Sequence, residues 1–158
     1  MQAQEIFDKL KTKFGTDVIE FFNEQPSDPY ITVNSEKIFD IAIFLRDDDD
    51  LLFDYLNCLS GLDLGDNLCV VYHLYSMKFL HRITIKAMLP RESPNIATVE
   101  RIWRTADWHE RETYDMFGVN FVGHHNLIRI LCPYDWEGYP LRKDYKTPEV
   151  FHGMKVPY

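Results

Sequence analysis

The sequence predicts an α+β domain in which helices pack on a small antiparallel sheet, followed by an extended C-terminal arm. Segment 79–89 alternates two sets of residues with a period of two, which is typical of a strand. Other segments place apolar residues three and four positions apart, as on one face of a helix. The last 26 residues, 133–158, mix prolines, rings and charges and follow neither pattern. We therefore expect a domain over 1–132 and an arm over 133–158.

The first half of the chain predicts three helices and two short strands. Ile6, Leu10 and Phe14 share one helical face, and Gly15 provides a stop. One of the four consecutive aspartates, Asp47–Asp50, caps the third helix, because a carboxylate satisfies the free N–H groups of a first turn. The predicted elements are a helix over 4–14, strands over 17–22 and 30–33, a helix from Asn34 or Ser35 to about Arg46, and a helix over 51–59.

The second half predicts a hairpin and two helices. Segments 68–75 and 79–89 are joined by a short connection, which favours an antiparallel pair. Thr98 is expected to cap a helix that turns Glu100 outward. Its apolar face has members at i, i+3, i+4 and i+7, namely Val99, Ile102, Trp103 and Ala106. A further helix is expected just after Asp107.

Composition narrows the classes of function. The chain has 158 residues and a net charge of −8, with 15 acids and 5 bases in residues 1–66. An acidic front half argues against nucleic-acid binding, whose affinity comes from Lys and Arg neutralising phosphates. No window approaches the ~20 apolar residues of a membrane-spanning helix. The N-terminus also lacks the apolar region of a signal peptide.

The three cysteines, Cys58, Cys69 and Cys132, predict neither a disulfide framework nor a cluster. Their number is odd and the sequence contains no C-x-x-C spacing. Iron–sulfur ligation needs clustered cysteines. We expect free thiols that behave as small buried residues.

The stretch from Trp108 to Asp144, called the signature stretch below, contains most of the candidate functional residues. Glu112 and Asp115 lie at i and i+3 and share a helix face. Such a pair is compatible with acid–base catalysis or with salt bridges. No nucleophile or metal ligand accompanies them, so the sequence favours salt bridges.

His124 and His125 resemble a metal-binding pair. Adjacent residues on a regular element point in opposite directions, and the zinc spacing H-x-x-x-H is absent. The sequence therefore predicts no metal site. It also contains no G-x-S-x-G, no phosphate-cradling glycine-rich loop and no G-x-G-x-x-G after a strand.

The end of the signature stretch predicts a protein-binding surface. Prolines remove hydrogen-bond donors, and the interleaved rings and charges of 133–144 form no single buried face. Aromatic residues and arginines such as Trp136 and Arg142 are typical anchors at interfaces. The alternative is a tail that folds back on its own domain.

These residues carry a family resemblance. The run Glu110–Val119 (ERETYDMFGV), the residues Gly123-His124 and Arg129-Ile130-Leu131, and the run Gly138–Asp144 (GYPLRKD) resemble the signature of the C-type subunit of bacterial NADH:quinone oxidoreductase (respiratory complex I). The J-type subunit of the chloroplast complex belongs to the same family. The family usually has Pro at the position of His125 and often a second Arg at the position of Ile128.

The resemblance implies a non-catalytic scaffold subunit of the hydrophilic arm of a proton-translocating NADH:quinone oxidoreductase. It implies no bound cofactor, with FMN and Fe–S clusters in partner subunits. The expected partners are the subunit of the quinone site and the subunit that holds the terminal Fe–S cluster. The expected location is peripheral, on the cytoplasmic side of the inner membrane. The residues expected to brace the stretch or to contact partners are Glu110, Arg111, Glu112, Asp115, His124, Arg129, Trp136, Arg142, Lys143 and Asp144.

Two alternatives remain open at this point. The same scaffold occurs in related machines, such as a membrane-bound hydrogenase or a ferredoxin- or F420-dependent quinone reductase. A free-standing enzyme would instead use Glu112, Asp115 and His124.

Overall fold

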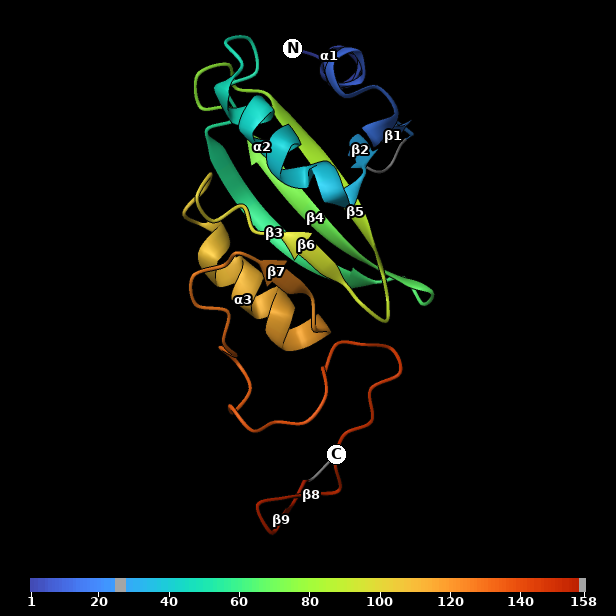
Figure 1. Cartoon of the computed structure of the whole chain (residues 1–158), viewed down its shortest axis with the longest axis vertical. Coiled ribbons are helices and arrows are strands. Elements are labelled where there is room, and N and C mark those ends of the chain that lie inside the picture. Colours follow the sequence, from blue (N-terminus) through green and yellow to red (C-terminus); the bar gives the residue numbers. More distant parts are fainter. Residues whose placement is uncertain (25–27, 157–158) are drawn as a thin grey trace.

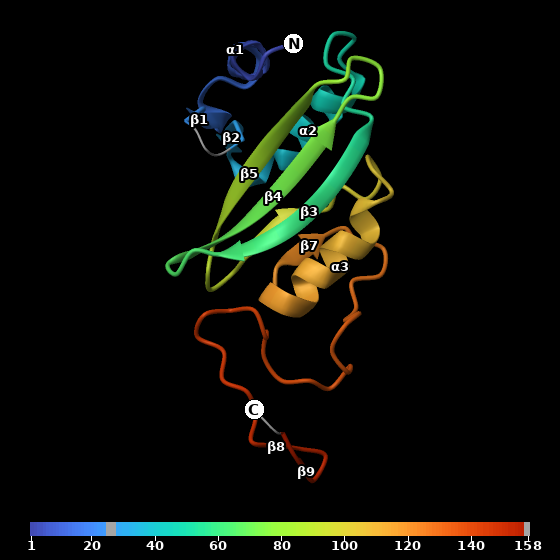
Figure 2. The same cartoon turned by 180° about the vertical axis from the view of Figure 1, so that it is seen from behind.

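A computed structural model describes residues 1–24 and 28–156. The domain is a mixed sheet of five strands in the order β1-β2-β5-β4-β3. Helix α2 crosses one face of the sheet, and α3 lies beside β3 (Figure 1). Seen from behind, strands β3, β4 and β5 have no helix of the described chain across them (Figure 2). The α+β class is confirmed.

The N-terminal elements follow the prediction closely. Helix α1 spans Ala3–Phe14 and ends at Gly15, whose φ of +54° suits glycine. Ile6 and Leu10 of this helix are fully buried. Strands β1 (Val18–Phe22) and β2 (Tyr30–Val33) form an antiparallel pair. The intervening segment 25–27 lies outside the described residues.

Asn34 caps the next helical segment, as predicted. Its side chain accepts a hydrogen bond from the N–H of Glu36 at the start of a short 3-10 turn, Ser35–Lys37. Helix α2 (Ile38–Asp47) continues from this turn. It buries an apolar face against the sheet, consisting of Ile38, Ile41, Ala42 and Leu45.

The predicted helix over 51–59 is wrong. The chain turns after Asp48, and Leu52 takes a positive φ of 40° that ends any helical path. Strand β3 (Tyr55–Asp63) follows and pairs with β4 (Asn67–Tyr75). Strand β4 also pairs antiparallel with β5 (Arg82–Pro90), which confirms the predicted hairpin.

One pairing departs from an all-antiparallel sheet. Strands β2 and β5 run parallel, with Ile31 opposite Ile85. Helix α2 and the β3–β4 hairpin intervene in the sequence, which gives the chain the long connection that a parallel pair requires. A second parallel pair joins β6 (Asn95–Ala97) to β7 (Asn120–Val122).

The predicted helix from Thr98 to Ala106 is also wrong. Residues 98–105 form irregular turns, and the helix is α3, Ala106–Phe117. The apolar positions Val99, Trp103 and Ala106 are nevertheless buried as the spacing suggested. Trp103 is fixed by its indole N–H, which donates to the carbonyl of Phe53 at 2.8 Å.

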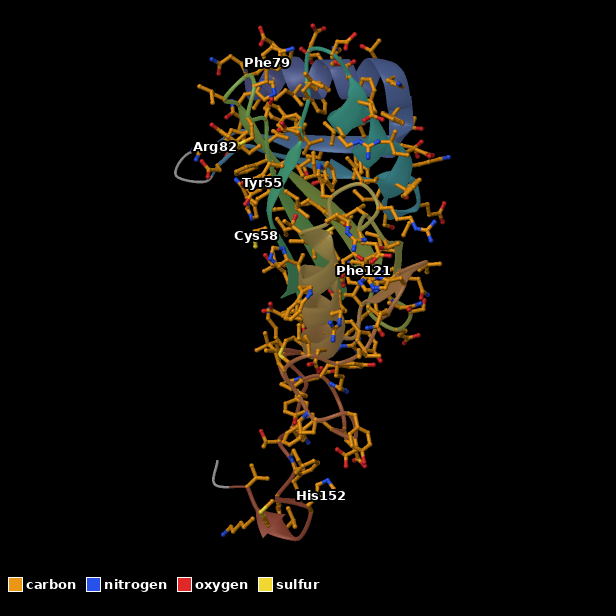
Figure 3. All side chains as sticks on the ribbon, turned by 90° about the vertical axis from the view of Figure 1, so that its left-hand side faces the viewer. Tyr55, Cys58, Phe79, Arg82, Phe121 and His152 are labelled. Carbon is orange, nitrogen blue, oxygen red and sulfur yellow. The ribbon has the colours of Figure 1, made fainter. Side chains whose placement is uncertain are left out.

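The chain after β7 is irregular and leaves the body of the domain. It runs along the end of α3 and then away from it, ending in a hairpin of β8 (Val150–Phe151) and β9 (Met154–Lys155) (Figure 1). His152 lies in this distal hairpin, whereas Tyr55, Cys58 and Arg82 lie on the uncovered side of the sheet (Figure 3). No helix in the described residues is long and apolar enough to span a bilayer.

Candidate functional site

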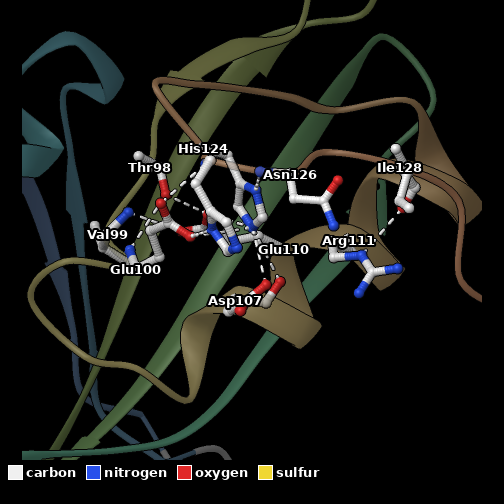
Figure 4. A network of polar contacts seen from close by, with 10 residues as sticks. Thr98, Val99, Glu100, Asp107, Glu110, Arg111, His124, Asn126 and Ile128 are labelled. Carbon is white, nitrogen blue, oxygen red and sulfur yellow. Dashed lines mark hydrogen bonds and ion pairs between the residues drawn. The ribbon is translucent and has the colours of Figure 1, made fainter.

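Helix α3 organises the signature stretch, because residues on two of its sides hold separate polar networks. One network, the acid–histidine cluster, lies between α3 and the chain that flanks β6 and β7 (Figure 4). The other, the arm anchor, holds the segment that follows residue 128. The members of the acid–histidine cluster are Thr98, Glu100, Asp107, Glu110, His124 and His125. The members of the arm anchor are Asp63, Arg91, Asp115, Arg129, Arg142 and Asp144.

Glu110 is the buried carboxyl of the acid–histidine cluster. Its oxygens accept the hydroxyl hydrogen of Thr98 at 2.5 Å and the N–H of Val99 at 2.8 Å. Burial raises the pKa of Glu110 to about 7 against those two hydrogen bonds, and the charges of Glu100 and Asp107 act in the same direction as burial. The residue thus fastens the turns before α3 to α3 itself.

The side chain of His124 is fully buried among carboxylates. Its Nε2 lies 3.4 Å from Oδ1 of Asp107, 3.5 Å from Oε2 of Glu100 and 3.9 Å from Oε2 of Glu110 (Figure 4). The Nδ1 atom accepts the N–H of Asn126 at 3.0 Å. With Nδ1 as an acceptor, a neutral ring carries its proton on Nε2 and donates it to the backbone carbonyl of Asp107 at 3.2 Å, with the three carboxylates slightly further away.

His125 approaches the same carboxylate as His124. Its Nδ1 lies 2.6 Å from Oε2 of Glu100, and its backbone N–H donates to Oε1 at 3.0 Å. Burial acts to raise the pKa of Glu100, but the bonds from His125 outweigh it, so this pKa lies below its ordinary value. The two imidazole rings stack, with centroids 5.2 Å apart and planes 14° from parallel. The expectation that adjacent histidines diverge is wrong, because they lie in a turn and not on a regular element.

Asp115 is the central residue of the arm anchor. Its Oδ2 accepts three successive backbone N–H groups, from Ile130 at 3.0 Å, Leu131 at 2.7 Å and Cys132 at 2.8 Å. Its Oδ1 lies 2.6 Å from Nη1 of Arg129. Burial acts to raise the pKa of Asp115, but the three N–H groups and the guanidinium outweigh it and hold the pKa below its ordinary value.

Arg129 and Arg142 extend the anchor along the arm. Arg129 donates to the carbonyls of Asp115 at 3.1 Å and Gly138 at 2.8 Å. Arg142 donates from Nε to the carbonyl of Phe117, at the end of α3, at 2.6 Å. Both guanidinium groups lie over the ring of Tyr139, at 5.4 and 4.8 Å from its centroid. The two arginines therefore act within the chain.

Asp63 fastens the end of the signature stretch to β3. It accepts hydrogen bonds from Arg91 at 2.7 Å and from the N–H of Lys143 at 2.7 Å. Arg91 also pairs with Asp144 at 2.6 Å. The guanidinium of Arg91 is the main cause that holds the pKa of Asp63 far below its ordinary value. The side chain of Lys143 takes no part in this contact.

The other predicted site residues lie further out. Glu112 is exposed and forms no ion pair within the described chain. Arg111 donates to the carbonyl of Ile128 at 3.3 Å and lies over the ring of Trp108. Trp136 donates to the hydroxyl of Tyr145 at 3.0 Å. The favoured salt-bridge interpretation therefore applies to Asp115 but not to Glu112.

The structure separates the residues of the free-standing enzyme hypothesis. His124 belongs to the acid–histidine cluster, Asp115 is saturated by the arm anchor, and Glu112 is exposed. A nucleophile–base pair requires its members within hydrogen-bond reach of each other. No such contact joins these three among the described residues.

Six members of the two networks are absent from the expected site residues: Asp63, Arg91, Thr98, Glu100, Asp107 and His125. Glu100 was placed on the outward face of a helix that does not form. Asp63 and Arg91 lie 28 positions apart, Asp63 at the end of β3 and Arg91 just after β5, and β4 lies between these two strands. No periodic signal connects such positions.

Fold and site together define a class, an α+β domain with a C-terminal segment fastened along one helix. Residues 31–150 match the family described as "Respiratory-chain NADH dehydrogenase, 30 Kd subunit". The chain belongs to this family.

Curated relatives are, by name, C-type subunits of NADH-quinone oxidoreductase. The protein of Chloroherpeton thalassium is 51% identical over 152 residues, which cover 94% of this chain and 63% of the relative. The protein of Chlorobium phaeobacteroides is 47% identical over 161 residues, covering 99% of this chain and 96% of the relative. The chain thus spans less than two thirds of the first relative and nearly all of the second.

Two solved structures share the fold. A trypsin-resistant fragment of Nqo5 superposes with a TM-score of 0.66 at 24% identity, covering 80% of this chain and 100% of the fragment. A chain of the membrane-bound sulfane sulfur reductase, an archaeal respiratory membrane complex, gives 0.75 at 23% identity, covering 92% and 86%.

Proposed function

We propose that this chain is the C-type subunit of a proton-translocating NADH:quinone oxidoreductase, where it acts as a non-catalytic scaffold of the hydrophilic arm. It supports electron transfer from NADH through FMN and Fe–S centres to quinone by fixing the positions of subunits that hold them. Its partners are chiefly the quinone-site subunit and the subunit with the terminal Fe–S cluster. It sits peripherally on the cytoplasmic side of the inner membrane, held by these partners.

The observation that carries this proposal is the arm anchor. Asp115 and Arg129 make six hydrogen bonds that hold a segment with no helix or strand. Irregular chain held this firmly still presents large apolar side chains to solvent. They are Ile128 (53% exposed), Leu131 (63%), Tyr134 (92%) and Leu141 (55%). Exposed apolar groups on an ordered segment are typical of a surface that another protein covers.

The polar networks support a structural role over a catalytic one. Asp115 has both oxygens satisfied within the chain, and the arginines of the anchor are bonded to carbonyls. Groups committed to such bonds hold geometry and are not free to exchange protons with a substrate. The family relationship and the saturated anchor thus favour the same function.

Substitution of Arg142 tests the proposal. Arg142→Ala removes the bond to Phe117 and the contact with Tyr139, so we expect a lower yield of assembled complex while the purified chain still folds. Lys146→Ala, at an exposed position of the same arm, is the matched control. Assembly is measured by native electrophoresis of solubilised membranes, and folding by thermal unfolding of the isolated chain. A fully assembled and fully active Arg142→Ala complex refutes the assignment.

A second candidate is the equivalent subunit of a related machine, a membrane-bound hydrogenase or a ferredoxin- or F420-dependent quinone reductase. This candidate is supported by the fold shared with the sulfane sulfur reductase chain, because that chain belongs to another respiratory membrane complex. Affinity purification of the tagged chain from solubilised membranes separates the candidates. A flavin-binding, NADH-oxidising subunit among the proteins recovered supports the first, and a hydrogenase-type subunit supports the second.

A further inference from the structure

We propose that Glu100, Asp107, His124 and His125 form a binding site for a divalent transition-metal cation of the Zn²⁺ class. The inference concerns the acid–histidine cluster alone and stands independently of the proposed scaffold function. It rests on the juxtaposition of four ligand atoms, on uncompensated negative charge and on access from solvent.

The four side chains converge on one point. Each offers one ligand atom, and these atoms all lie within 4.8 Å of one another. Zinc–nitrogen and zinc–oxygen bonds of about 2.0–2.1 Å in a tetrahedron place neighbouring ligands about 3.4 Å apart. The separations from Nε2 of His124 to Asp107 and Glu100, 3.4 and 3.5 Å, match this spacing.

Binding requires only a small rearrangement of the remaining ligands. The 2.6 Å contact between His125 and Glu100 is a hydrogen bond, and it lengthens when a cation replaces the shared proton. The widest separation in the group must shorten. The side chain of His125 is 51% exposed and lies in a turn, so it has room to move.

The cluster carries negative charge that no cationic side chain balances. Glu100 and Glu110 are buried, and Asp107 is largely so. Within the described chain no lysine or arginine lies in ion-pair range of these three carboxyls, and their only basic neighbours are the two histidines. Burying carboxylate charge without a cationic side chain beside it is unfavourable. A dication held by Glu100 and Asp107 removes that penalty.

Glu110 lies beside the site and is not counted among its ligands. Its Oε2 is 3.9 Å from Nε2 of His124 and accepts the hydroxyl hydrogen of Thr98.

The proton balance is simple. Nε2 of His124 must offer its lone pair, so its proton exchanges through water to Nδ1. Two bonds are then lost, the one from the exposed N–H of Asn126 and the one to the carbonyl of Asp107. His125 frees Nδ1 in the same way and keeps a proton on Nε2. Neither ring changes its net protonation, and the two carboxylates bind as they are.

The donor set selects the class of ion. Two imidazoles and two carboxylates suit Zn²⁺, Co²⁺ or Ni²⁺, whereas Mg²⁺ and Ca²⁺ prefer oxygen ligands in larger number. His125 at its surface edge gives an ion a path into the otherwise buried site.

The test is metal titration of the purified full chain with Zn²⁺ and with Co²⁺ as a spectroscopic substitute. We compare the natural chain with His125→Ala and Glu100→Gln, and with His152→Ala as a matched control. His152 is an exposed histidine that also pairs with a carboxylate, Asp135, but lies in the distal hairpin. Substitution of the exposed His125 leaves the buried packing intact, and circular dichroism confirms folding of each variant.

We expect one Zn²⁺ per chain, the intense visible absorption of tetrahedral Co²⁺, and no competition from excess Mg²⁺. Loss of one ligand should weaken binding on the order of tenfold or more in His125→Ala and Glu100→Gln, and His152→Ala should bind as the natural chain does. The amide resonance of Asn126 should shift on binding. The proposal is overturned if the chain takes up no stoichiometric Zn²⁺, or if folded His125→Ala and Glu100→Gln bind it unchanged.

Discussion

Replacement of Asp115 by asparagine should release the segment after α3 while leaving the domain folded. The carboxylate accepts three backbone N–H groups and pairs with Arg129 at 2.6 Å, and its side chain is fully buried. Asparagine has the same shape but only one oxygen, and its amide N–H₂ must face either the guanidinium or the backbone donors. At one of these two places, an acceptor oxygen that faced an N–H donor is replaced by an N–H₂ group, so two donors then face each other.

The magnitude follows from the burial of the pair. Removing one partner of a buried ion pair costs about 3–5 kcal/mol. The amide oxygen of asparagine keeps part of the hydrogen bonding to Ile130–Cys132, so we expect the lower end, about 3 kcal/mol. A domain is typically stable by about 5–15 kcal/mol, which leaves the body folded. The loss instead appears as local opening of the segment, which becomes about 100-fold more frequent.

Amide hydrogen exchange of the purified chain measures this opening residue by residue. The amides of Ile130, Leu131 and Cys132 should exchange about 100-fold faster in Asp115→Asn, while amides of β4 keep their protection. Glu112→Gln, an exposed substitution on the same helix, serves as the control and should leave all three amides unchanged. Unaltered exchange of the three amides in a folded Asp115→Asn chain refutes the anchor.

Three further predictions concern pH and two close contacts. The pKa of Asp115 is lowered from 3.8, so the contribution of its carboxylate to stability is complete above that value and is lost as pH falls through the folded pKa. Exchange protection of the segment should therefore be flat from pH 7 to 5 and fall below about pH 4. In Asp115→Asn this pH dependence should be absent. Gly118→Ala should destabilise the chain by about 1–3 kcal/mol in thermal unfolding, because φ is +73° and the new Cβ would lie 2.4 Å from the ring of Tyr139; an unchanged melting temperature contradicts it. Trp103→Phe should cost about 1–3 kcal/mol in urea unfolding by leaving the carbonyl of Phe53 without its indole donor, and a midpoint equal to that of the natural chain counts against this reasoning.

Strand β3 occupies part of the segment for which a helix was predicted, and its buried positions do not alternate regularly. Its pairing with β4 shifts register between Leu56 and Cys58, so the buried positions are Leu56, Leu59 and Gly61. Leu56 and Leu59 are therefore three positions apart, as on one face of a helix, whereas Leu59 and Gly61 are two apart, as on a strand. A bulge depends on contacts with the neighbouring strand, which are not visible in the local sequence. The spacing of apolar residues in this segment could not by itself distinguish a helix from a bulged strand.

The acid–histidine cluster was hidden by two errors of local geometry. Glu100 was expected on the solvent face of a helix, but the segment folds as turns and buries it. His124 and His125 were expected to diverge, but their turn lets both rings reach Glu100. Both inferences assumed regular elements. The candidate metal site therefore emerges only when tertiary packing is known.

The prediction of paired charge in the signature stretch holds for one of its two carboxylates. The structure confirms the ion pair of Asp115, although its partner, Arg129, lies 14 positions away in irregular chain. That separation explains why the local pattern indicated the right chemistry for Asp115 but grouped it with Glu112, its exposed neighbour on the same helix. Side chains in irregular segments have no period by which a partner can be assigned.

The arm anchor also bears on how the chain would bind its neighbours. A disordered segment that folds on binding loses part of its interaction energy to ordering, about 2–5 kcal/mol. Here Asp115, Arg129 and Arg142 have already fixed the segment from residue 129 to the end of the signature stretch in the free chain. Leu131 and Tyr134 are thus presented in position before a partner arrives. Under the proposed function, the charges of the arm anchor would lower the entropic cost of binding by holding these side chains in place.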